Sequence, residues 1–156
     1  LSDDLMSKLS ALLLPRWSRN NPIDCAGGET RDTVIEIMDI VAAHDSIDAV
    51  IFLGIGIQSN QAKMMRSGGF YPDHGLERIV SYHEKQDERY ALTAREVASK
   101  YGKPILIATE LAVADPENAG PAAVRESGAY CYPTGARAAS SLAHLYEYAK
   151  YRGIAQ

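Results

Sequence analysis

Three short apolar runs, separated by helical patterns, constrain the fold of this chain more than any other feature. They lie at residues 49–53, 105–108 and 130–132. The first two contain β-branched residues and no polar ones, which is typical of strands buried on both faces of a parallel sheet. Helices between parallel strands imply right-handed β-α-β crossovers. The sequence therefore predicts an α/β fold with a doubly wound, Rossmann-like parallel sheet.

Helical spacing of apolar residues predicts the remaining elements. Helices are expected at about 2–14, 30–43, 58–65, 75–101, 121–128 and 134–152. An irregular stretch at 16–29 contains the turn signals Asn21-Pro22 and Gly27-Gly28. Gly102 is expected to end the long helix, because glycine suits the left-handed position after a helix C-terminus. Glu84, Asp87 and Glu88 are predicted to lie on its solvated face.

The predicted sheet is thin for a doubly wound unit. One edge would be an apolar, buried-type strand with nothing beside it, which is an aggregation liability. The first helix also has no strand before it, and the chain begins at Leu1 rather than Met. We expect residues 1–156 to be a single domain and a fragment of a larger multidomain chain. The sheet would then lack its first strand or strands here, unless a neighbour covers the gap.

Composition excludes several classes of protein. A length of 156 residues suits one domain, and a net charge of −4 argues against a nucleic-acid partner, which would favour a basic surface. No apolar run approaches the roughly 20 residues that span a bilayer. Cys25 and Cys131 are far apart in the sequence and are expected to be reduced thiols. We therefore expect a cytoplasmic protein with no membrane partner.

Gly54-Ile55-Gly56 follows the first predicted strand and precedes a predicted helix, which is the context of a dinucleotide-binding loop. Ser59 stands where that loop has its third glycine, and no acidic residue ends a later strand at the usual spacing. Three interpretations stay open: a nucleotide cradle, a tight turn after a strand, and a ligand-facing loop of another kind. Gly54 and Gly56 are candidates to face a ligand, because open α/β sheets bind ligands at the carboxyl ends of their strands.

Other chemistry-bearing residues form no recognised catalytic or metal-binding set. The histidines His44, His74, His83 and His144 have no metal-ligand spacing, and structural or surface roles are expected for them. His44 would lie at a helix C-terminus, where a cation is favoured. His74 is the best catalytic candidate among the four. Glu110 follows the second strand and is the carboxylate most suited to face a ligand.

Three segments carry a resemblance to a known family. They are Asn21-Pro22-Ile23-Asp24 before a helix, Asp48-Ala49-Val50-Ile51-Phe52, and Tyr101-Gly102-Lys103-Pro104-Ile105-Leu106. From about residue 10 to 152, the order of elements resembles the flavodoxin-like ligase domain of the NDP-forming acyl-CoA synthetases, the superfamily of succinyl-CoA synthetase. Residues 55–90 are expanded relative to that domain.

The chain departs from that family in what it lacks. The family's domain opens with a strand and a glycine-rich loop, and its phosphorylated histidine belongs to another domain, beside a Ser-His-Thr-Gly motif that is absent here. The CoA-binding and ATP-grasp domains are absent as well. No histidine of this chain inherits the phosphorylated role, so we assign no catalytic residue and no metal ligand.

The resemblance implies a ligase reaction for the whole enzyme: acid, CoA and NTP give acyl-CoA, NDP and phosphate. CoA, ATP or ADP, and Mg²⁺ would bind to the complete enzyme and not to this chain alone. Its partners would be the CoA-binding and ATP-grasp domains, and a homodimer is possible. We expect this chain to be inactive alone and to form one wall of the site.

The ligand-facing candidates of that wall are Asn21, Asp24, Gly27, Gly28, Gly54, Gly56 and Glu110. Asn21 and Asp24 have an alternative role, which is to fix their turn through local side-chain-to-backbone bonds. Two alternatives to the ligase interpretation also stay open. One is a non-catalytic protein-interaction domain whose open strand edge pairs with a partner or with itself. The other is a free-standing flavodoxin-like nucleotide binder.

Overall fold

A computed structural model describes residues 1–27 and 31–154. Contacts between Cα atoms divide the chain into two compact units. Unit 1 comprises Leu1–Val50 and Thr93–Ile105, and unit 2 comprises Ile51–Leu92 and Leu106–Gln156.

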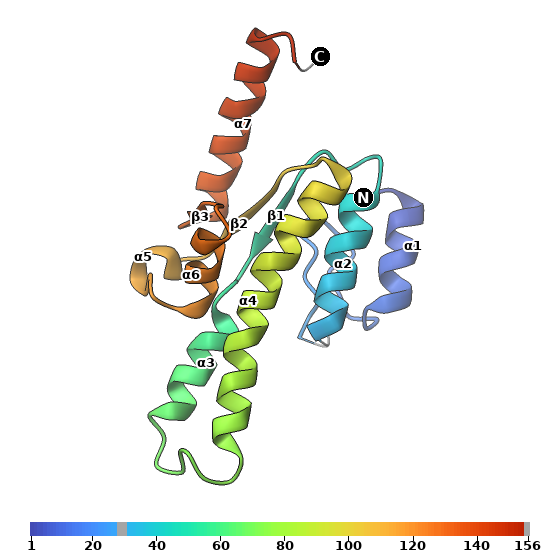
Figure 1. The fold of residues 1–156 in the computed structure, drawn as a ribbon. Coiled ribbons are helices and arrows are strands. Elements are labelled where there is room, and N and C mark those ends of the chain that lie inside the picture. Colours follow the sequence, from blue (N-terminus) through green and yellow to red (C-terminus); the bar gives the residue numbers. More distant parts are fainter. Residues whose placement is uncertain (28–30, 155–156) are drawn as a thin grey trace. The chain divides into compact units, whose positions relative to one another are not determined.

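The described residues form an α/β fold, as the alternating pattern predicts (Figure 1). The strands are β1 Val50–Leu53, β2 Ile105–Ala108 and β3 Cys131–Tyr132, in the spatial order β1-β2-β3. The helices are α1 Asp3–Leu12, α2 Arg31–Ala43, α3 Ile57–Arg66, α4 Leu76–Tyr101, α5 Leu111–Ala114, α6 Ala119–Glu126 and α7 Gly135–Tyr151. The single turn of α5 was not predicted.

The sheet is parallel. Val50 N–H donates to the Pro104 carbonyl at 3.0 Å, and Gly54 N–H donates to the Ala108 carbonyl at 3.2 Å. In both bonds the donor and the acceptor are separated by the same number of residues in the sequence. β1 and β2 therefore run in one direction. β3 is parallel to β2, with Ile107 opposite Cys131. The predicted parallel sheet is confirmed, although Leu53 is 56% exposed, so β1 is less buried than its apolar sequence predicts.

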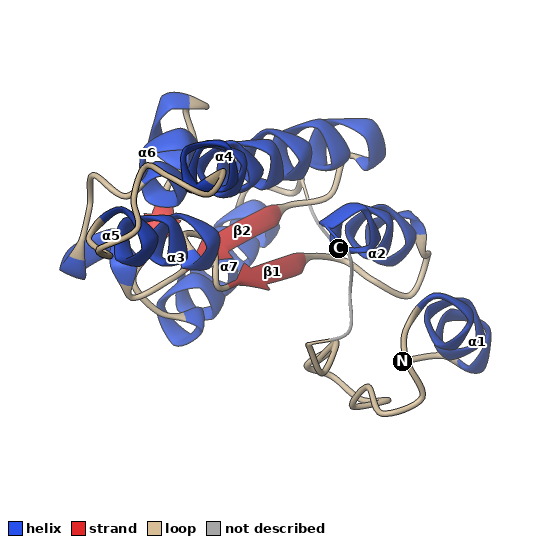
Figure 2. Cartoon of the chain, turned by 90° about the horizontal axis from the view of Figure 1, so that it is seen from below, coloured by secondary structure: helices blue, strands red, loops and turns tan. Residues whose placement is uncertain are grey.

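Helices cover both faces of the sheet in unit 2 (Figure 2). On one face, Leu106 and Ala108 pack against Ala138 of α7. On the other face, the rings of Phe52 and Tyr90 of α4 meet edge to face, with centroids 6.0 Å apart. Successive residues of a strand point to opposite faces, which explains why neighbouring positions serve different helices.

Unit 1 has its own apolar core, built largely from the leucine stripe predicted for the first helix. Leu5 and Leu9 of α1 are fully buried, and they cluster with residues of α2 such as Val41. Burial of one leucine side chain contributes roughly 2 kcal/mol to folding. Gly102 ends α4 in the left-handed region at φ 63°, and Lys103 N–H donates back to the Ala98 carbonyl, so the predicted glycine cap is confirmed.

Within residues 55–90, α3 and the first part of α4 form a helical hairpin, which belongs to unit 2 (Figure 1). Arg66 of α3 pairs with Glu84 of α4 at 2.9 Å. Phe70, in the loop that joins the helices, is 72% exposed. Among the described residues, no helix combines the length and apolar character needed to cross a membrane.

Candidate functional site

The turn between β1 and α3 holds the most extensively bonded polar groups of unit 2. Gly54 and Gly56 have φ angles of 86° and 93°, in the left-handed region that favours glycine. The Asp87 carboxylate of α4 accepts three hydrogen bonds here: from Gly56 N–H at 3.0 Å, from Ser59 N–H at 2.7 Å and from the Ser59 hydroxyl at 2.6 Å. Asp87 is 1% exposed. It therefore caps the N-terminus of α3 from a distant position in the sequence.

A second buried side chain holds the same turn through its carbonyl. Asn118 is 7% exposed, and its amide donates to the Gly56 carbonyl at 3.2 Å. The Asn118 side-chain oxygen accepts from Gly120 N–H at 3.0 Å, so the residue also caps α6. A Cβ on Gly120 would lie 2.5 Å from the Gly56 nitrogen. Only glycine at position 120 permits this close backbone approach.

These contacts decide what the turn can bind. A helix N-terminus attracts phosphate through its free N–H groups and its dipole. The buried Asp87 carboxylate already takes the N–H groups of Gly56 and Ser59, and its negative charge would repel a second anion. The turn does not fit a nucleotide phosphate, and its geometry favours the tight-turn interpretation. The prediction that Asp87 lies on a solvated helix face was wrong.

Sequence reasoning missed Asp87 because nothing nearby in the chain indicates its partners. Ser59 lies 28 positions before it. The only available signal was an acidic residue at a position facing the same way as the apolar stripe of α4, where a buried carboxylate requires a partner. Asn118 had a clearer signal, because asparagine is a preferred N-cap just before a predicted helix.

The loop between α1 and α2 contains the other group of candidates, and it lies in unit 1. The Asp24 carboxylate accepts from Ala26 N–H at 2.8 Å, which is a local side-chain-to-backbone turn. The Ser18 hydroxyl accepts from Asp24 N–H at 3.0 Å and donates to the Pro22 carbonyl at 2.9 Å. These bonds agree with the turn-fixing alternative for Asp24. The bond to Ala26 uses one of the two oxygens of the Asp24 carboxylate, and a ligand-facing role for Asp24 stays a prediction.

The other ligand-facing candidates of this loop are Asn21, Gly27 and Gly28. Asn21 is exposed and forms a cis peptide bond with Pro22. Gly27 is exposed, with a φ of 66° and open space around its Cα. Gly28 lies outside the described residues. The loop candidates belong to unit 1 and the turn candidates to unit 2.

Glu110 lies at the carboxyl end of β2, one strand away from the Gly54 turn. Its side chain is exposed, whereas the preceding Thr109 is 4% exposed. Thr109 N–H donates to the Tyr132 carbonyl at 2.9 Å, and its hydroxyl accepts from Leu111 N–H at 3.3 Å. These bonds of Thr109 do not use the Glu110 side chain, whose ligand-facing role stays a prediction.

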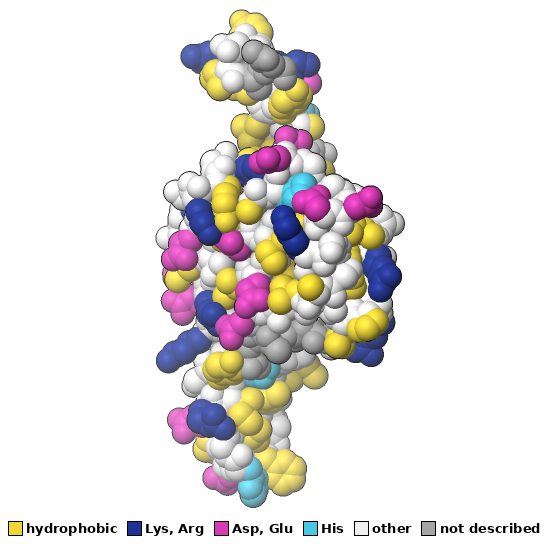
Figure 3. Space-filling model, turned by 90° about the vertical axis from the view of Figure 1, so that its right-hand side faces the viewer, with side chains coloured by type: hydrophobic (Ala, Val, Ile, Leu, Met, Phe, Trp, Pro, Cys, Tyr) yellow, Lys and Arg dark blue, Asp and Glu magenta, His cyan; other side chains and the backbone are white. Residues whose placement is uncertain are grey.

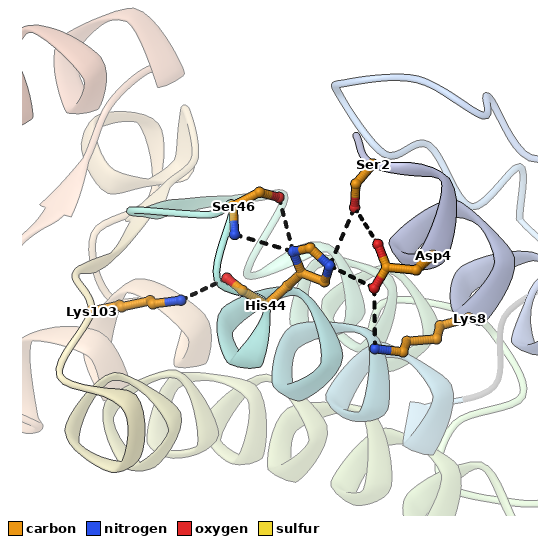
Figure 4. Close-up of polar contacts among 6 residues, drawn as sticks. All are labelled: Ser2, Asp4, Lys8, His44, Ser46 and Lys103. Atoms are coloured by element: carbon orange, nitrogen blue, oxygen red, sulfur yellow. Dashed lines mark hydrogen bonds and ion pairs between the residues drawn. The ribbon is translucent and has the colours of Figure 1, made fainter.

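A polar cluster in unit 1 surrounds His44, which directly follows α2 as predicted (Figure 4). Ser46 N–H donates to Nδ1 of His44 at 3.2 Å, so Nδ1 carries a lone pair and Nε2 is the donor toward the Asp4 carboxylate at 2.9 Å. Lys103 donates to the His44 carbonyl at 2.7 Å. The cluster joins the start of α1 to the end of α2 and satisfies a carbonyl at the C-terminus of α2.

The carboxylate of Asp4 is surrounded by hydrogen-bond donors and a lysine. Hydrogen bonds from Ser2 and then from His44 hold the pKa of the Asp4 carboxyl well below its usual range. Lys8 lies 3.5 Å from the same carboxylate. A hollow of about 390 Å³ beside the cluster is also lined by Asp39, whose carboxylate pairs with Lys100 at 2.7 Å. Because these charged groups have partners within the chain, the cluster has a structural role, which is to hold the start of α1 against the end of α2.

The other histidines and the cysteines have structural or surface positions. His83 is 8% exposed and hydrogen-bonds the Gln58 side chain, while His144 is exposed on α7. The ring of His74 contacts Phe70 edge to face in the hairpin loop. Cys25 and Cys131 are free thiols, and burial raises the pKa of the Cys131 thiol.

The surface has no dominant sign of charge on the face drawn in Figure 3, where basic and acidic side chains are interspersed. Within the described residues, no three His, Cys, Asp or Glu side chains gather in a way that could hold a metal ion. No family model, curated protein or solved structure matches the chain.

Proposed function

We propose that the chain is a non-catalytic scaffold within an NDP-forming acyl-CoA synthetase of the succinyl-CoA synthetase superfamily. The whole enzyme would convert acid, CoA and NTP to acyl-CoA, NDP and phosphate. CoA, ATP and Mg²⁺ would bind with the CoA-binding and ATP-grasp domains, in the cytoplasm. The sheet would be the flavodoxin-like sheet of that family. Segment resemblance supports this proposal, since its Asn-Pro-Ile-Asp loop, Asp-Ala-Val strand and Lys-Pro-Ile strand occur in the family's order.

One observation carries the scaffold part of the proposal. Asp87 takes up the N–H groups of Gly56 and Ser59 at the N-terminus of α3, the place where an open α/β sheet would otherwise bind a phosphate. This observation favours a scaffold over a free-standing nucleotide binder. The 21–27 loop and the exposed Glu110 would then face a ligand that other domains hold.

The first experiment separates the two interpretations with the purified chain. With acetate or succinate, CoA and ATP, we expect no thioester absorbance at 232 nm. Dialysis against FMN should leave no bound flavin. Thioester formation by the chain alone would contradict the scaffold role, and stoichiometric FMN uptake would favour the nucleotide binder.

The second experiment uses the complete gene product that carries this chain. We expect it to release ADP only when acid, CoA and ATP are all present. Asp24→Asn keeps an oxygen that accepts from Ala26 N–H but removes the charge. If Asp24 faces the ligand, Asp24→Asn lowers kcat/KM about 10-fold with an unchanged melting temperature, which corresponds to about 1.4 kcal/mol. The matched control is His144→Gln, an exposed position on α7.

The outcomes of the second experiment are distinct. Normal activity of Asp24→Asn together with reduced stability of Asp24→Ala assigns Asp24 to its turn alone. A complete gene product that consumes no ATP under any of these conditions contradicts the ligase proposal itself.

A further inference from the structure

β1 ends the sheet, and within the part of the chain that the structure describes its outward backbone groups have no strand to pair with. Among the described residues, β1 has β2 as its neighbour in the sheet and no strand on its other side. Val50 and Gly54 direct their N–H groups toward β2. The N–H and C=O of one residue point to the same side of a strand, and successive residues alternate. Ile51 and Leu53 therefore direct their N–H and C=O groups away from β2.

Nothing in the sequence of β1 protects this edge. Natural edge strands carry charged residues, proline or bulges, or are very short. β1 consists of Val50, Ile51, Phe52 and Leu53, and Leu53 is 56% exposed. The opposite edge differs, because β3 has two residues and only Cys131 directs its peptide groups outward. β1 is thus the edge on which a further strand can pair.

We propose that the outward edge of β1 binds an extended, uncharged segment of a partner polypeptide, which adds to the sheet as a fourth strand. Main-chain bonds to Ile51 and Leu53 would fix its register. α7 and α4 cover the two faces of the sheet beside β1. Side chains of the added strand would extend both apolar layers, so the segment is apolar on both faces.

Size argues for an extended segment rather than a second folded copy. Four strand residues span roughly 13 Å, and the edge offers two N–H and two C=O groups. A stable dimer buries about 1,200–2,000 Å², which an edge of this length does not supply. A strand tethered within a larger assembly needs less contact area, because tethering raises its effective concentration. The tether is that of the larger assembly under the proposed function, so this step rests on that function, whereas the pairing of the β1 edge is argued from the sheet alone.

Amide hydrogen exchange of the whole chain tests whether the edge is open. In dilute solution, Ile51 and Leu53 amides should exchange about 100-fold faster than those of Phe52 and Gly54. A probe strand, Thr-Val-Ile-Val-Thr, is then joined to the N-terminus through a flexible Gly/Ser linker of about 20 residues. The probe should slow exchange at Ile51 and Leu53 about 100-fold. A control probe with Pro at its centre should not.

Leu53→Pro provides a matched variant. Its N–H points away from β2, so proline there removes an outward donor and leaves the β1–β2 bonds in place. We expect Leu53→Pro to retain the far-UV circular dichroism of the parent and to lose protection of Ile51 by the probe. Phe52→Pro removes a donor that faces β2 and should disrupt the sheet.

Three results would overturn the proposal. The first is slow exchange of Ile51 and Leu53 in the dilute chain without a probe, since another part of the chain would then cover the edge. The second is no protection by the probe strand. The third is protection that rises with chain concentration together with a doubled mass in sedimentation, which would assign the edge to a second copy. The exchange experiment does not depend on a substituted chain folding, because it is done with the unsubstituted sequence. It also does not depend on acyl-CoA formation.

Discussion

Two turns of this molecule are each held by an aspartate, and they differ in where that aspartate comes from. Asp24 lies in its own turn, is exposed, and accepts one hydrogen bond from Ala26, two residues later. Asp87 is 1% exposed and accepts three bonds from Gly56 and Ser59, which lie about 30 positions earlier in the chain. One residue type thus serves as a local turn former and as a long-range cap.

The difference in burial between Asp24 and Asp87 indicates which of the two the stability of the fold depends on. Water can replace the Asp24 carboxylate at an exposed N–H, so its bond contributes little. No water can easily replace Asp87, and its loss would leave buried donors unpartnered. The effect of a substitution should therefore follow burial of the partners.

Asp87→Ala should give the largest effect. It removes the acceptor for Gly56 N–H, Ser59 N–H and the Ser59 hydroxyl, all buried. Breaking a buried charged network in this way lowers the free energy of unfolding by about 3–5 kcal/mol. Urea unfolding followed by circular dichroism measures the change. Asp87→Asn keeps one oxygen acceptor and should lose about half as much. A loss below about 1 kcal/mol for Asp87→Ala would contradict the role of the cap.

Gly56→Ala should destabilise the same turn from its backbone. The residue has φ 93°, and an added Cβ would lie 2.7 Å from Oδ1 of Asn118 and 2.8 Å from Cδ1 of Leu111. Backbone strain and overpacking together should lower the free energy of unfolding by about 2–4 kcal/mol. Gly102→Ala is the matched control, because Gly102 has φ 63° and nothing within 4 Å of its added Cβ. It should cost about 1 kcal/mol, and equal losses for the two variants would exclude the steric contribution.

The sequence was sufficient where the physical cause is local. The apolar runs around Phe52 and Ile107 predicted the strands, and Gly102 predicted the end of α4, because periodicity and left-handed glycine act within a few residues. Asp87 was placed wrongly, because its partners are brought to it only by the packing of α3 on α4. The ligand-facing roles of Asn21, Asp24, Gly27, Gly28, Gly54, Gly56 and Glu110 stay predictions, since the bonds around them explain structure without a ligand.

Asp24→Ala should have a small effect on stability. It removes one exposed hydrogen bond to Ala26 N–H, which water then satisfies. We expect the free energy of unfolding to fall by about 0.5 kcal/mol. Thermal unfolding of Asp24→Ala beside Asp24→Asn measures it, and the Asn variant should match the parent because it keeps the acceptor. A loss above about 2 kcal/mol would mean that burial is not what separates the two turns.

Asp4 sharpens the comparison, because it combines exposure with a distant partner. Its carboxylate accepts from the Ser2 hydroxyl at 2.7 Å and from His44, 40 positions away, at 2.9 Å, yet its side chain is 60% exposed. If burial decides, Asp4→Asn should be among the mildest variants despite this long-range bond. If the distance along the chain decides, it should resemble Asp87→Ala.

The size of the loss for Asp4→Asn separates these two cases, and its pH dependence tests whether the loss comes from the charged carboxylate. Hydrogen bonds from Ser2 and His44 lower the pKa of Asp4 in the folded state, so the folded chain binds this proton less readily than the unfolded chain. The contribution of Asp4 is therefore fully present above about pH 4, the usual range of an aspartate, and is lost as the pH falls below it. The stability difference between the parent and Asp4→Asn should be small and constant from pH 5 to 6, and should shrink toward pH 3. Unfolding midpoints in urea across this range measure it, with Asp3→Asn as the neighbouring control. A difference that grows on acidification would have the wrong sign for a carboxylate held in its charged form.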